Sequence, residues 1–441
     1  MSKLKFAFSL SLCMLSALYV PAQQKLDEYM EHLFHNRKFM GSVAISFKDS
    51  IIYAKQVGYA NVRAGQENNM DTKFRVASIS KTFTAVLVLQ AVEAGKLSLE
   101  DKLSRYYPEI KNADKITIEQ LLKHRSGIFN FTDHKDRGQW EARFHTERES
   151  VAHIAKEKPR FEPGTDYEYS NSNYLLLGYI LECIYDKPYA LLLEENICKR
   201  LQLNNTYFTN ETDLSRNEAL SYNIQDTYLK NASVNFSNHP ASGGIASTAT
   251  DLNKFLAALF KGKLISKESL EMMLPVDKGA YGMGIFKLSF DQPEGFEHAG
   301  RIENYISDYW YFPKEELGVV SLANAINIDI EDINTTLLQY AYGKAPKLPD
   351  FNKIEGYAEE AFKALKGTYT AKKTKQKITI SSDGNVLVLQ LSGLGQDYLP
   401  FEYKGNNTFV YKDIKMQFFP EQKEMRYEQG KATLQYKKQA G

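Results

Sequence analysis

The chain has 441 residues, of which 43% are hydrophobic and 25% charged, so a folded protein of two or three domains is expected rather than a disordered one. Its 55 basic and 54 acidic residues give a formal net charge of +1 without a long basic run, which removes the usual reason to expect nucleic acid as a partner. Aromatic residues make up 12% of the chain, a share typical of a well-filled core and β-strands.

The N-terminal segment, residues 1–22, is predicted to be a secretory signal peptide. A basic start leads into an apolar run from Phe6 to Val20, which ends in small residues and is shorter than a membrane span of about 20 residues. Cys13 lies inside this run rather than at its end, so lipidation is not predicted. We expect export through the inner membrane, a periplasmic location and a soluble mature chain that begins at Gln23.

The mature chain is strand-like toward both ends of its main part and helical in the middle. The predicted elements are a helix over 24–36, strands over 42–47 and 51–54, a long apolar helix over 78–93, a mostly helical block over 106–240, a helix over 251–260, strands over 284–288, 305–312 and 317–322, and a helix over 328–342. This order indicates one sheet assembled from distant segments, with a helical lobe inserted against it. A ligand site is expected in the cleft between the two.

Two cysteines remain in the mature chain, Cys183 and Cys198, and both lie among apolar residues. Two cysteines do not make a disulfide framework, so we predict two buried free thiols.

The last part of the chain is predicted to be a separate all-β domain. Ala345–Asp350 is a predicted linker, and a short helix is predicted at Tyr357–Leu365. From Thr368 to Lys438, short alternating segments are separated by turn residues, which is typical of a small barrel or sandwich. The predicted boundaries are 1–22 for the signal peptide, 23–345 for the main domain, 346–366 for the linker and short helix, and 367–441 for the β-domain.

The first candidate catalytic motif is Ser78-Ile79-Ser80-Lys81, at the start of the long apolar helix. Residues i and i+3 share a helix face, so Lys81 is expected one turn from Ser78. A serine hydroxyl needs a base, and burial together with the positive end of the helix favours a neutral Lys81 that can serve as one. Ser2-Lys3-Leu4-Lys5 matches the same pattern, so the four residues are not specific by themselves.

Two further motifs carry polar groups suited to acyl chemistry. In Tyr169-Ser170-Asn171, the tyrosine can shuttle protons beside a lysine and the asparagine amide can bind substrate. His298-Ala299-Gly300 is followed by Arg301, and we place it just before a strand. Its glycine permits close approach of the backbone to a ligand, and its histidine adds a polar ring.

The three motifs together resemble the serine β-lactamase and penicillin-binding superfamily, in particular the branch of class C β-lactamases, D-aminopeptidases, D-alanyl-D-alanine carboxypeptidases and related esterases. Ser-x-x-Lys, Tyr-x-Asn and Lys- or His-x-Gly stand in the family's order, 91 residues apart from Ser78 to Tyr169 and 129 apart from Tyr169 to His298. The similarity covers about Leu26 to Tyr342. It implies an α/β (α+β) fold with an antiparallel sheet flanked by helices and an inserted helical lobe, followed here by the all-β domain.

The resemblance implies catalytic roles for four residues. Ser78 resembles the acylated nucleophile, and Lys81 and Tyr169 resemble the proton-transfer pair, with the identity of the base left open. His298 stands where relatives have Lys and would tune Tyr169.

Substrate binding is implied for four others. Asn171 resembles the residue that contacts the substrate amide. Ala299, Gly300 and Arg301, in and after the third motif, are also expected to bind substrate. The N–H groups of Ser78 and Arg301 would form the oxyanion hole. Where penicillin-recognising relatives carry a hydroxyl that helps bind a carboxylate, this chain has Ala299, so carboxylate recognition is in doubt unless Arg301 replaces it.

These residues predict a serine hydrolase that forms an acyl-enzyme on Ser78 and acts on a small acyl substrate, with short esters, D-amino-acid peptides and β-lactams expected in that order. The alternative is a non-catalytic penicillin-binding-like sensor or binding protein, although such proteins usually lose a motif residue. Neither a cofactor nor a metal is expected, because the histidines, among them His134 and His153, show no ligand motif. The oligomeric state and the role of the β-domain are left open.

Overall fold

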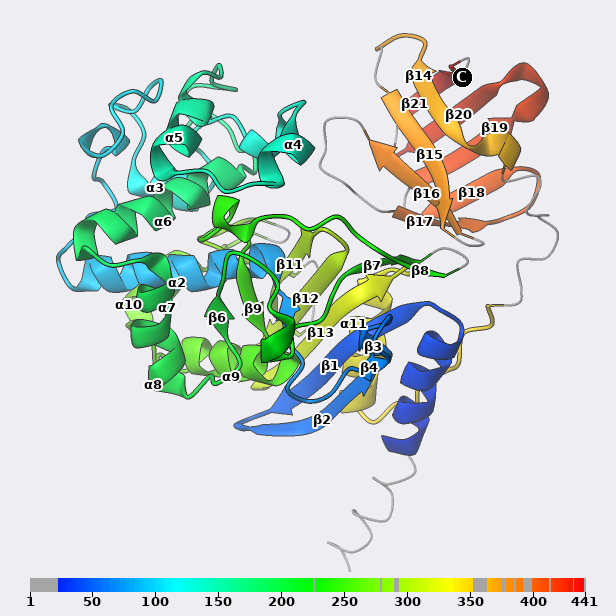
Figure 1. Cartoon of the computed structure of the whole chain (residues 1–441), viewed down its shortest axis with the longest axis horizontal. Helices are drawn as coiled ribbons and strands as arrows, with labels where there is room; N and C mark the ends of the chain where they lie inside the picture. Colours follow the sequence, from blue (N-terminus) through cyan, green and yellow to red (C-terminus); the bar gives the residue numbers. More distant parts are fainter. Residues whose placement is uncertain are drawn as a thin grey trace, which may run out of the picture.

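The computed structural model describes residues 23–224, 227–277, 280–288, 293–351, 363–374, 377–383, 386–391, 399–411, 414–430 and 432–439. The predicted signal peptide and most of the predicted helix at Tyr357–Leu365 lie outside these residues. Within them a mixed domain with a six-stranded sheet carries a helical lobe and is followed by a barrel (Figure 1). Among the described residues, no helix has the length and apolar character that crossing a membrane requires.

The central sheet is antiparallel and joins the two ends of the main domain, as the sequence predicts. Its order is β10 (Phe286–Lys287), β11 (Phe296–Ile302), β12 (Tyr305–Phe312), β13 (Leu317–Ile326), β1 (Phe39–Phe47) and β2 (Ser50–Val57). Strand β13 is buried along its whole length and β1 along all but its last residue. Because both faces of these strands are covered, their sequences read as continuous small and apolar runs.

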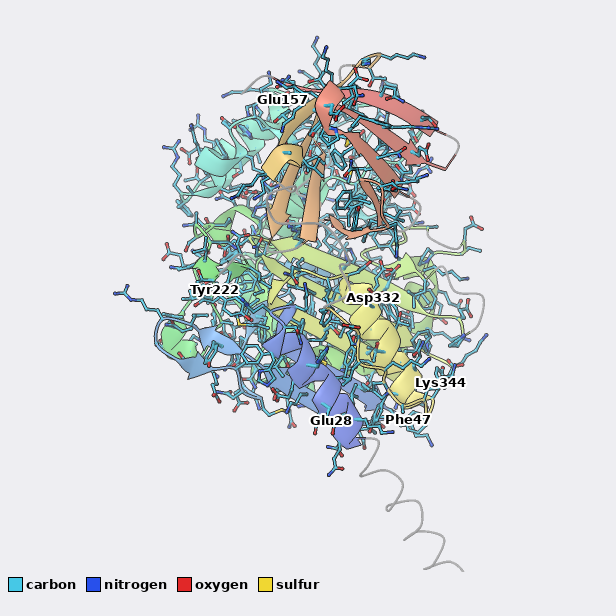
Figure 2. The ribbon with its side chains drawn as sticks, turned by 90° about the vertical axis from the view of Figure 1, so that its right-hand side faces the viewer. Glu28, Phe47, Glu157, Tyr222, Asp332 and Lys344 are labelled. Atoms are coloured by element: carbon cyan, nitrogen blue, oxygen red, sulfur yellow. The ribbon has the colours of Figure 1, made fainter. Side chains whose placement is uncertain are left out.

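One face of the sheet is covered by the first and last helices of the main domain. The helix over residues 23–35 and α11 (Ile330–Ala341) lie together on that face (Figures 1 and 2). Leu33 and Leu337 belong to the same buried cluster as Val319 of β13. The terminal helices therefore bring both ends of the domain onto the sheet.

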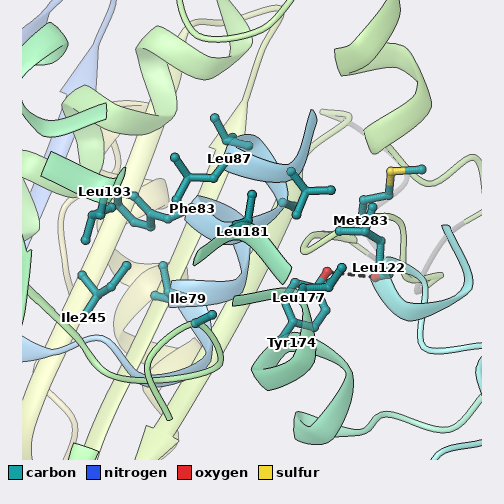
Figure 3. Packing of buried hydrophobic residues seen from close by; sticks show 14 of the residues in the cluster. Ile79, Phe83, Leu87, Leu122, Tyr174, Leu177, Leu181, Leu193, Ile245 and Met283 are labelled. Atoms are coloured by element: carbon teal, nitrogen blue, oxygen red, sulfur yellow. Dashed lines mark hydrogen bonds between the residues drawn. The ribbon is translucent and has the colours of Figure 1, made fainter. Parts of the chain in front are cut away.

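The other face is covered by α2 (Ser80–Glu93) and α9 (Ala249–Phe260), whose Phe83 and Phe255 rings stack with centroids 3.7 Å apart. Eleven of the fourteen residues of α2 are buried, so this helix is apolar around its circumference and lies inside the domain. Its far side packs against α6 (Asn171–Tyr185), and Figure 3 shows Leu177 and Leu181 within this cluster.

The helical lobe is formed by residues 106–240 and contains several helices, but helices and helical turns make up less than half of this block, so it is less helical than predicted. Its helices are α3 (Ile118–Leu122), α4 (Arg137–Glu141), α5 (Glu147–Ala155), α6, α7 (Tyr189–Leu193) and α8 (Lys199–Leu201), and α10 (Lys267–Met273) follows later. The block also contains short strands that the sequence does not reveal: β6 (Tyr207–Phe208), β7 (Tyr222–Ile224) and β8 (Tyr228–Lys230). Strands of two or three residues are too short to display an alternating pattern.

The C-terminal strands form a closed barrel, which is one of the two architectures that the sequence allows. The strands are β14 (Gly367–Ala371), β15 (Lys377–Asp383), β16 (Val386–Leu391), β17 (Leu399–Tyr403), β18 (Thr408–Tyr411), β19 (Ile414–Phe419), β20 (Glu424–Gln429) and β21 (Ala432–Lys438). The hydroxyl of Tyr411 donates to Oδ2 of Asp329 at 3.0 Å, which links the barrel to the start of α11.

Both cysteines are free, as predicted, and Cys198 is buried. The predicted burial of Cys183 is wrong, since this residue is exposed. It lies on α6, where the apolar neighbours in the sequence point to other faces of the helix and do not cover it.

A buried ion pair lies close to the segment that carries Ser78. Arg75 of β5 (Phe74–Arg75) pairs with Glu218 at 2.7 Å, and the two side chains are 1% and 2% exposed. The same guanidinium also donates to the carbonyls of Gly244, Thr209 and Glu211. It therefore ties the residue three positions before Ser78 to the loops around the site.

Arg75→Met is expected to destabilise the protein by about 3–5 kcal/mol, because it leaves the Glu218 carboxylate buried without its partner. Urea unfolding measures the change. The control is Arg105→Met, which breaks an exposed pair with Asp101 and should cost about 1 kcal/mol or less. Equal effects of the two substitutions would contradict a stabilising role for the buried pair.

Candidate active site

The nucleophile candidate lies in a strained turn. Ser78 is the middle residue of a 3₁₀ turn, Ala77–Ile79, that leads directly into α2. Ala77 has a φ of 46°, a left-handed conformation that costs a non-glycine residue about 1–3 kcal/mol and that clusters at functional sites. A Cβ at Gly300 would lie 2.4 Å from the carbonyl oxygen of Val76 and 2.8 Å from the amide nitrogen of Ser78. Only glycine therefore lets β11 pass this close to the nucleophile.

Lys81 lies beneath Ser78, fully buried, at the distance that its helix spacing predicts. Its Nζ is 3.1 Å from Oγ of Ser78, 2.8 Å from Oδ1 of Asn171 and 2.6 Å from the carbonyl oxygen of Ser242. Within the described part of the chain no carboxylate pairs with it. Burial therefore holds the pKa of Lys81 well below its ordinary value, and its neutral form is favoured.

Tyr169 stands over the same amine. The Nζ of Lys81 lies 5.0 Å from the centroid of its ring. Its hydroxyl oxygen is shielded from solvent and makes no hydrogen bond of normal geometry to the described residues. Burial raises the pKa of Tyr169, and the nearby Ser78 hydroxyl opposes part of that rise. The phenol is therefore held in its protonated form at neutral pH.

Asn171 is held in one orientation by the loop before α4. Its Nδ2 donates to Oγ1 of Thr132 at 3.1 Å and to Oδ1 of Asn130 at 3.3 Å, while its Oδ1 accepts from Lys81. Its backbone N–H also donates to Asn130 at 3.0 Å. The sequence did not indicate Asn130 or Thr132, which lie 41 and 39 positions away and belong to no motif.

His298 lies within β11, so the prediction that it precedes a strand is wrong. The inward positions of this strand include His298 and Gly300 instead of apolar residues, and the usual alternation is therefore missing. Nδ1 donates to the carbonyl of Ala299 at 2.7 Å, and Nε2 faces the Tyr281 hydroxyl at 3.5 Å. Burial, with the neighbouring Lys81 amine, lowers the pKa of His298 to about 3. This ring is neutral and does not replace the positive charge of a lysine.

His124 is a site residue that the sequence did not single out. It is fully buried, and its ring centroid lies 4.2 Å from that of Tyr169. Its Nδ1 accepts from the backbone N–H of Ser170 at 3.2 Å and from Nδ2 of Asn173 at 3.1 Å. Two donors on Nδ1 place the proton on Nε2, and burial keeps the pKa of His124 well below its usual range. The ring thus fixes the backbone between Tyr169 and Asn171.

His124→Leu is expected to lower kcat by about 10–100-fold with a smaller change in KM, because small displacements of catalytic groups are costly. His124→Asn should recover much of the loss, because its amide oxygen can accept from Ser170 and asparagine tolerates the φ of 54° found here. Steady-state kinetics of both variants test this. Equal activity of the two variants would argue against a role in holding Ser170.

The cleft above these residues has a volume of about 690 Å³. Of the predicted site residues, Ser78, Tyr169, Asn171, His298, Ala299 and Arg301 line it. Lys81 is buried below Ser78, and Gly300 packs against the Ser78 amide. The charged residues that line the cleft are five acidic and two basic ones: Asp133, Glu168, Glu297, Glu303, Glu331, Arg137 and Arg301. The cleft is therefore richer in carboxyl groups than in cations.

The chain is similar in sequence to known proteins. A family model described as Beta-lactamase matches residues 23–332. The PbpX protein of Bacillus subtilis (strain 168) is 30% identical over 269 residues, which are 60% of this chain and 66% of PbpX, so the chain spans just under two thirds of that relative.

Two solved structures extend the comparison. The D-amino acid amidase from Ochrobactrum anthropi SV3 is 25% identical with a TM-score of 0.62, over 72% of this chain and 99% of the amidase. The octameric penicillin-binding protein homologue from Pyrococcus abyssi is 24% identical with a TM-score of 0.63, over 93% of this chain and 99% of the homologue. The similarity to the Pyrococcus abyssi homologue shows the fold alone, and the aligned part of this chain includes C-terminal strands.

Proposed function

Because this chain belongs to the Beta-lactamase family and has the serine-hydrolase fold of β-lactamases and penicillin-binding proteins, we propose that it is a serine hydrolase that forms an acyl-enzyme on Ser78. The observation that carries the proposal is the 3.1 Å contact between Oγ of Ser78 and the buried Nζ of Lys81. An activated serine requires a base within hydrogen-bond reach, and this pair provides it.

The hydrogen bonds of Lys81 favour it as the base. A neutral amine has two N–H groups and one lone pair. The carbonyl oxygens of Asn171 and Ser242 can only accept, so they take the two N–H groups and leave the lone pair for the Ser78 proton. Tyr169, whose pKa is raised by burial, is then the donor that protonates the leaving group and recovers a proton from Lys81. Water attacks the acyl-enzyme and releases the acid.

The cleft favours a substrate that carries a positive charge. Its five acidic residues against two basic ones suit an ammonium group better than a carboxylate. Ala299 offers no hydroxyl to a substrate carboxylate. We therefore place D-amino-acid amides and short peptides with a free amine ahead of simple esters and β-lactams. The similarity to a D-amino acid amidase at 25% identity supports this order.

The test compares D-phenylalanine amide, its N-acetyl derivative and L-phenylalanine amide as substrates of the mature chain. A p-nitrophenyl ester, a penicillin and a fluorophosphonate are added, with intact-mass detection of adducts. We expect a fluorophosphonate adduct and preferred turnover of the D-amide with its free amine. Faster turnover of the N-acetyl derivative would contradict the ammonium preference, and the absence of every adduct and of turnover would overturn the hydrolase proposal.

A non-catalytic sensor on the same fold is the second candidate. No observation favours it, because Ser78, Lys81, Tyr169 and Asn171 are all present and in contact or facing one another. We also propose that the chain acts in the periplasm, which rests on the basic start and apolar run of residues 1–22.

A further inference from the structure

A second cluster of reactive side chains lies in the helical lobe, outside the cleft lining. His134, Asp136 and His153 each offer one nitrogen or oxygen atom, and these atoms lie within 4.8 Å of one another. His134 and Asp136 follow the short 3₁₀ turn Phe131–Asp133, and His153 projects from α5. Small side-chain movements would bring all three atoms to the distance of about 2.0–2.2 Å at which nitrogen and oxygen ligands hold zinc.

His153 is the buried member of the cluster. It is 9% exposed, and its Nε2 is shielded from solvent without a hydrogen-bond partner among the described residues. The ring of Trp140 stacks on it with centroids 4.0 Å apart, which fixes its plane. A buried ring nitrogen without a partner is unfavourable unless a ligand satisfies it.

His134 is oriented by a carboxylate on its other side. Its Nε2 lies 3.4 Å from Oε1 of Glu157, which follows the end of α5. If Nε2 donates to Glu157, the lone pair of Nδ1 faces the Oδ1 of Asp136, with which it is in contact. In that tautomer the two acceptor atoms repel each other unless a proton or a metal ion lies between them. A carboxylate behind a histidine ligand is also the usual support of a metal-bound imidazole.

We propose that His134, Asp136 and His153 bind a divalent transition metal, with Zn²⁺ the best match to two imidazoles, one carboxylate and a water. The ion would join the loop after Asn130 and Thr132 to α5. That loop holds the Asn171 amide, so the ion would steady one wall of the cleft without touching the reacting atoms. This inference does not depend on the proposed acyl chemistry.

The test is calorimetric titration of ZnCl₂ into the untagged mature chain after treatment with EDTA and removal of the chelator. We expect one Zn²⁺ per chain and a rise in Tm with zinc concentration. Co²⁺ in place of Zn²⁺ should give visible absorption bands typical of a protein-bound ion. The absence of stoichiometric binding would overturn the proposal and leave a proton as the cation between His134 and Asp136.

Two matched variants locate the site. His153→Phe and His145→Phe both keep a ring on Trp140, since His145 also stacks on it with centroids 3.5 Å apart. Only the first removes a ligand, so it should weaken Zn²⁺ binding by at least about tenfold while the second changes it little. Asp136→Asn, at a half-exposed position, should weaken binding similarly without disturbing the fold. Equal affinities in all three variants would overturn the proposal.

Discussion

Ser78→Ala is expected to lower hydrolysis by at least about 10⁴-fold, which is the largest effect of any single substitution in this chain. The variant lacks the only hydroxyl within hydrogen-bond reach of the buried Lys81 amine among the described residues. It should bind substrate and fold normally, because Ser78 is only partly buried and its side chain makes one hydrogen bond, to Lys81, among the residues that the structure describes. Intact-mass spectrometry should show no fluorophosphonate adduct on this variant.

Ser80→Ala is the matched control. Ser80 belongs to the same motif, but its Oγ accepts from the backbone N–H of Ile245 and lies in the core. Its loss should cost about 1–3 kcal/mol of stability through the unsatisfied amide, while the adduct on Ser78 still forms. Retained turnover in Ser78→Ala, or loss of the adduct in Ser80→Ala at a temperature where it is folded, would contradict the assignment of the nucleophile.

Local spacing and family resemblance predicted different parts of the site. The contact between Ser78 and Lys81 follows from three-residue helix spacing, and the sequence was sufficient for it. Tyr169 and His298 come close to Ser78 and Lys81 only because α6 packs beside α2 and β11 packs beside the turn that precedes α2. Spacing along the chain does not predict this proximity, and only the family's order of motifs indicated it. The left-handed conformation of Ala77 has no signal in the sequence, because alanine, unlike glycine or asparagine, rarely adopts a positive φ.

The remaining site residues depend on contacts between distant segments. His124 is recognisable as a site residue only from the structure, in which its ring packs against Tyr169 and its Nδ1 accepts a hydrogen bond from Ser170. The cluster of His134 and His153 joins a loop to a helix 19 positions later, which matches no regular ligand spacing. The neutral state of His298 likewise follows from burial, and a sequence reading by analogy with lysine relatives misses it.

Titration of Lys81 is expected to govern the pH dependence of the reaction. Burial disfavours the charged amine, so its pKa in the folded protein lies below the ordinary 10.5. The charged form predominates below that pKa and cannot accept the Ser78 proton. The rate constant kcat/KM should therefore be low at acid pH, rise as Lys81 loses its proton, and level off above its folded pKa.

Other groups at the site titrate outside this range. His298, with a pKa of about 3, is neutral wherever the enzyme is active, and burial of Tyr169 moves its ionisation above its ordinary value. Asp133 and Glu303 both line the cleft, and burial raises the pKa of each, so a rise of kcat/KM with pH could also come from either carboxyl. Asp133→Asn and Glu303→Gln should each leave that rise in place if Lys81 causes it.

Lys81→Met removes the proposed base while keeping the length and apolar stem of the side chain. General-base catalysis typically contributes about 10²–10⁴-fold, so we expect a loss of about 10³-fold in kcat/KM and disappearance of the rising limb. Thermal unfolding monitors the fold, because the oxygens of Asn171 and Ser242 lose their shared donor. A residual rate that keeps the wild-type pH profile would instead assign the base to Tyr169, whose pKa would then have to fall in the free enzyme. Burial shifts the pKa of the Lys81 amine down and the pKa of the Tyr169 phenol up, and this difference favours Lys81 as the base in the proposed mechanism.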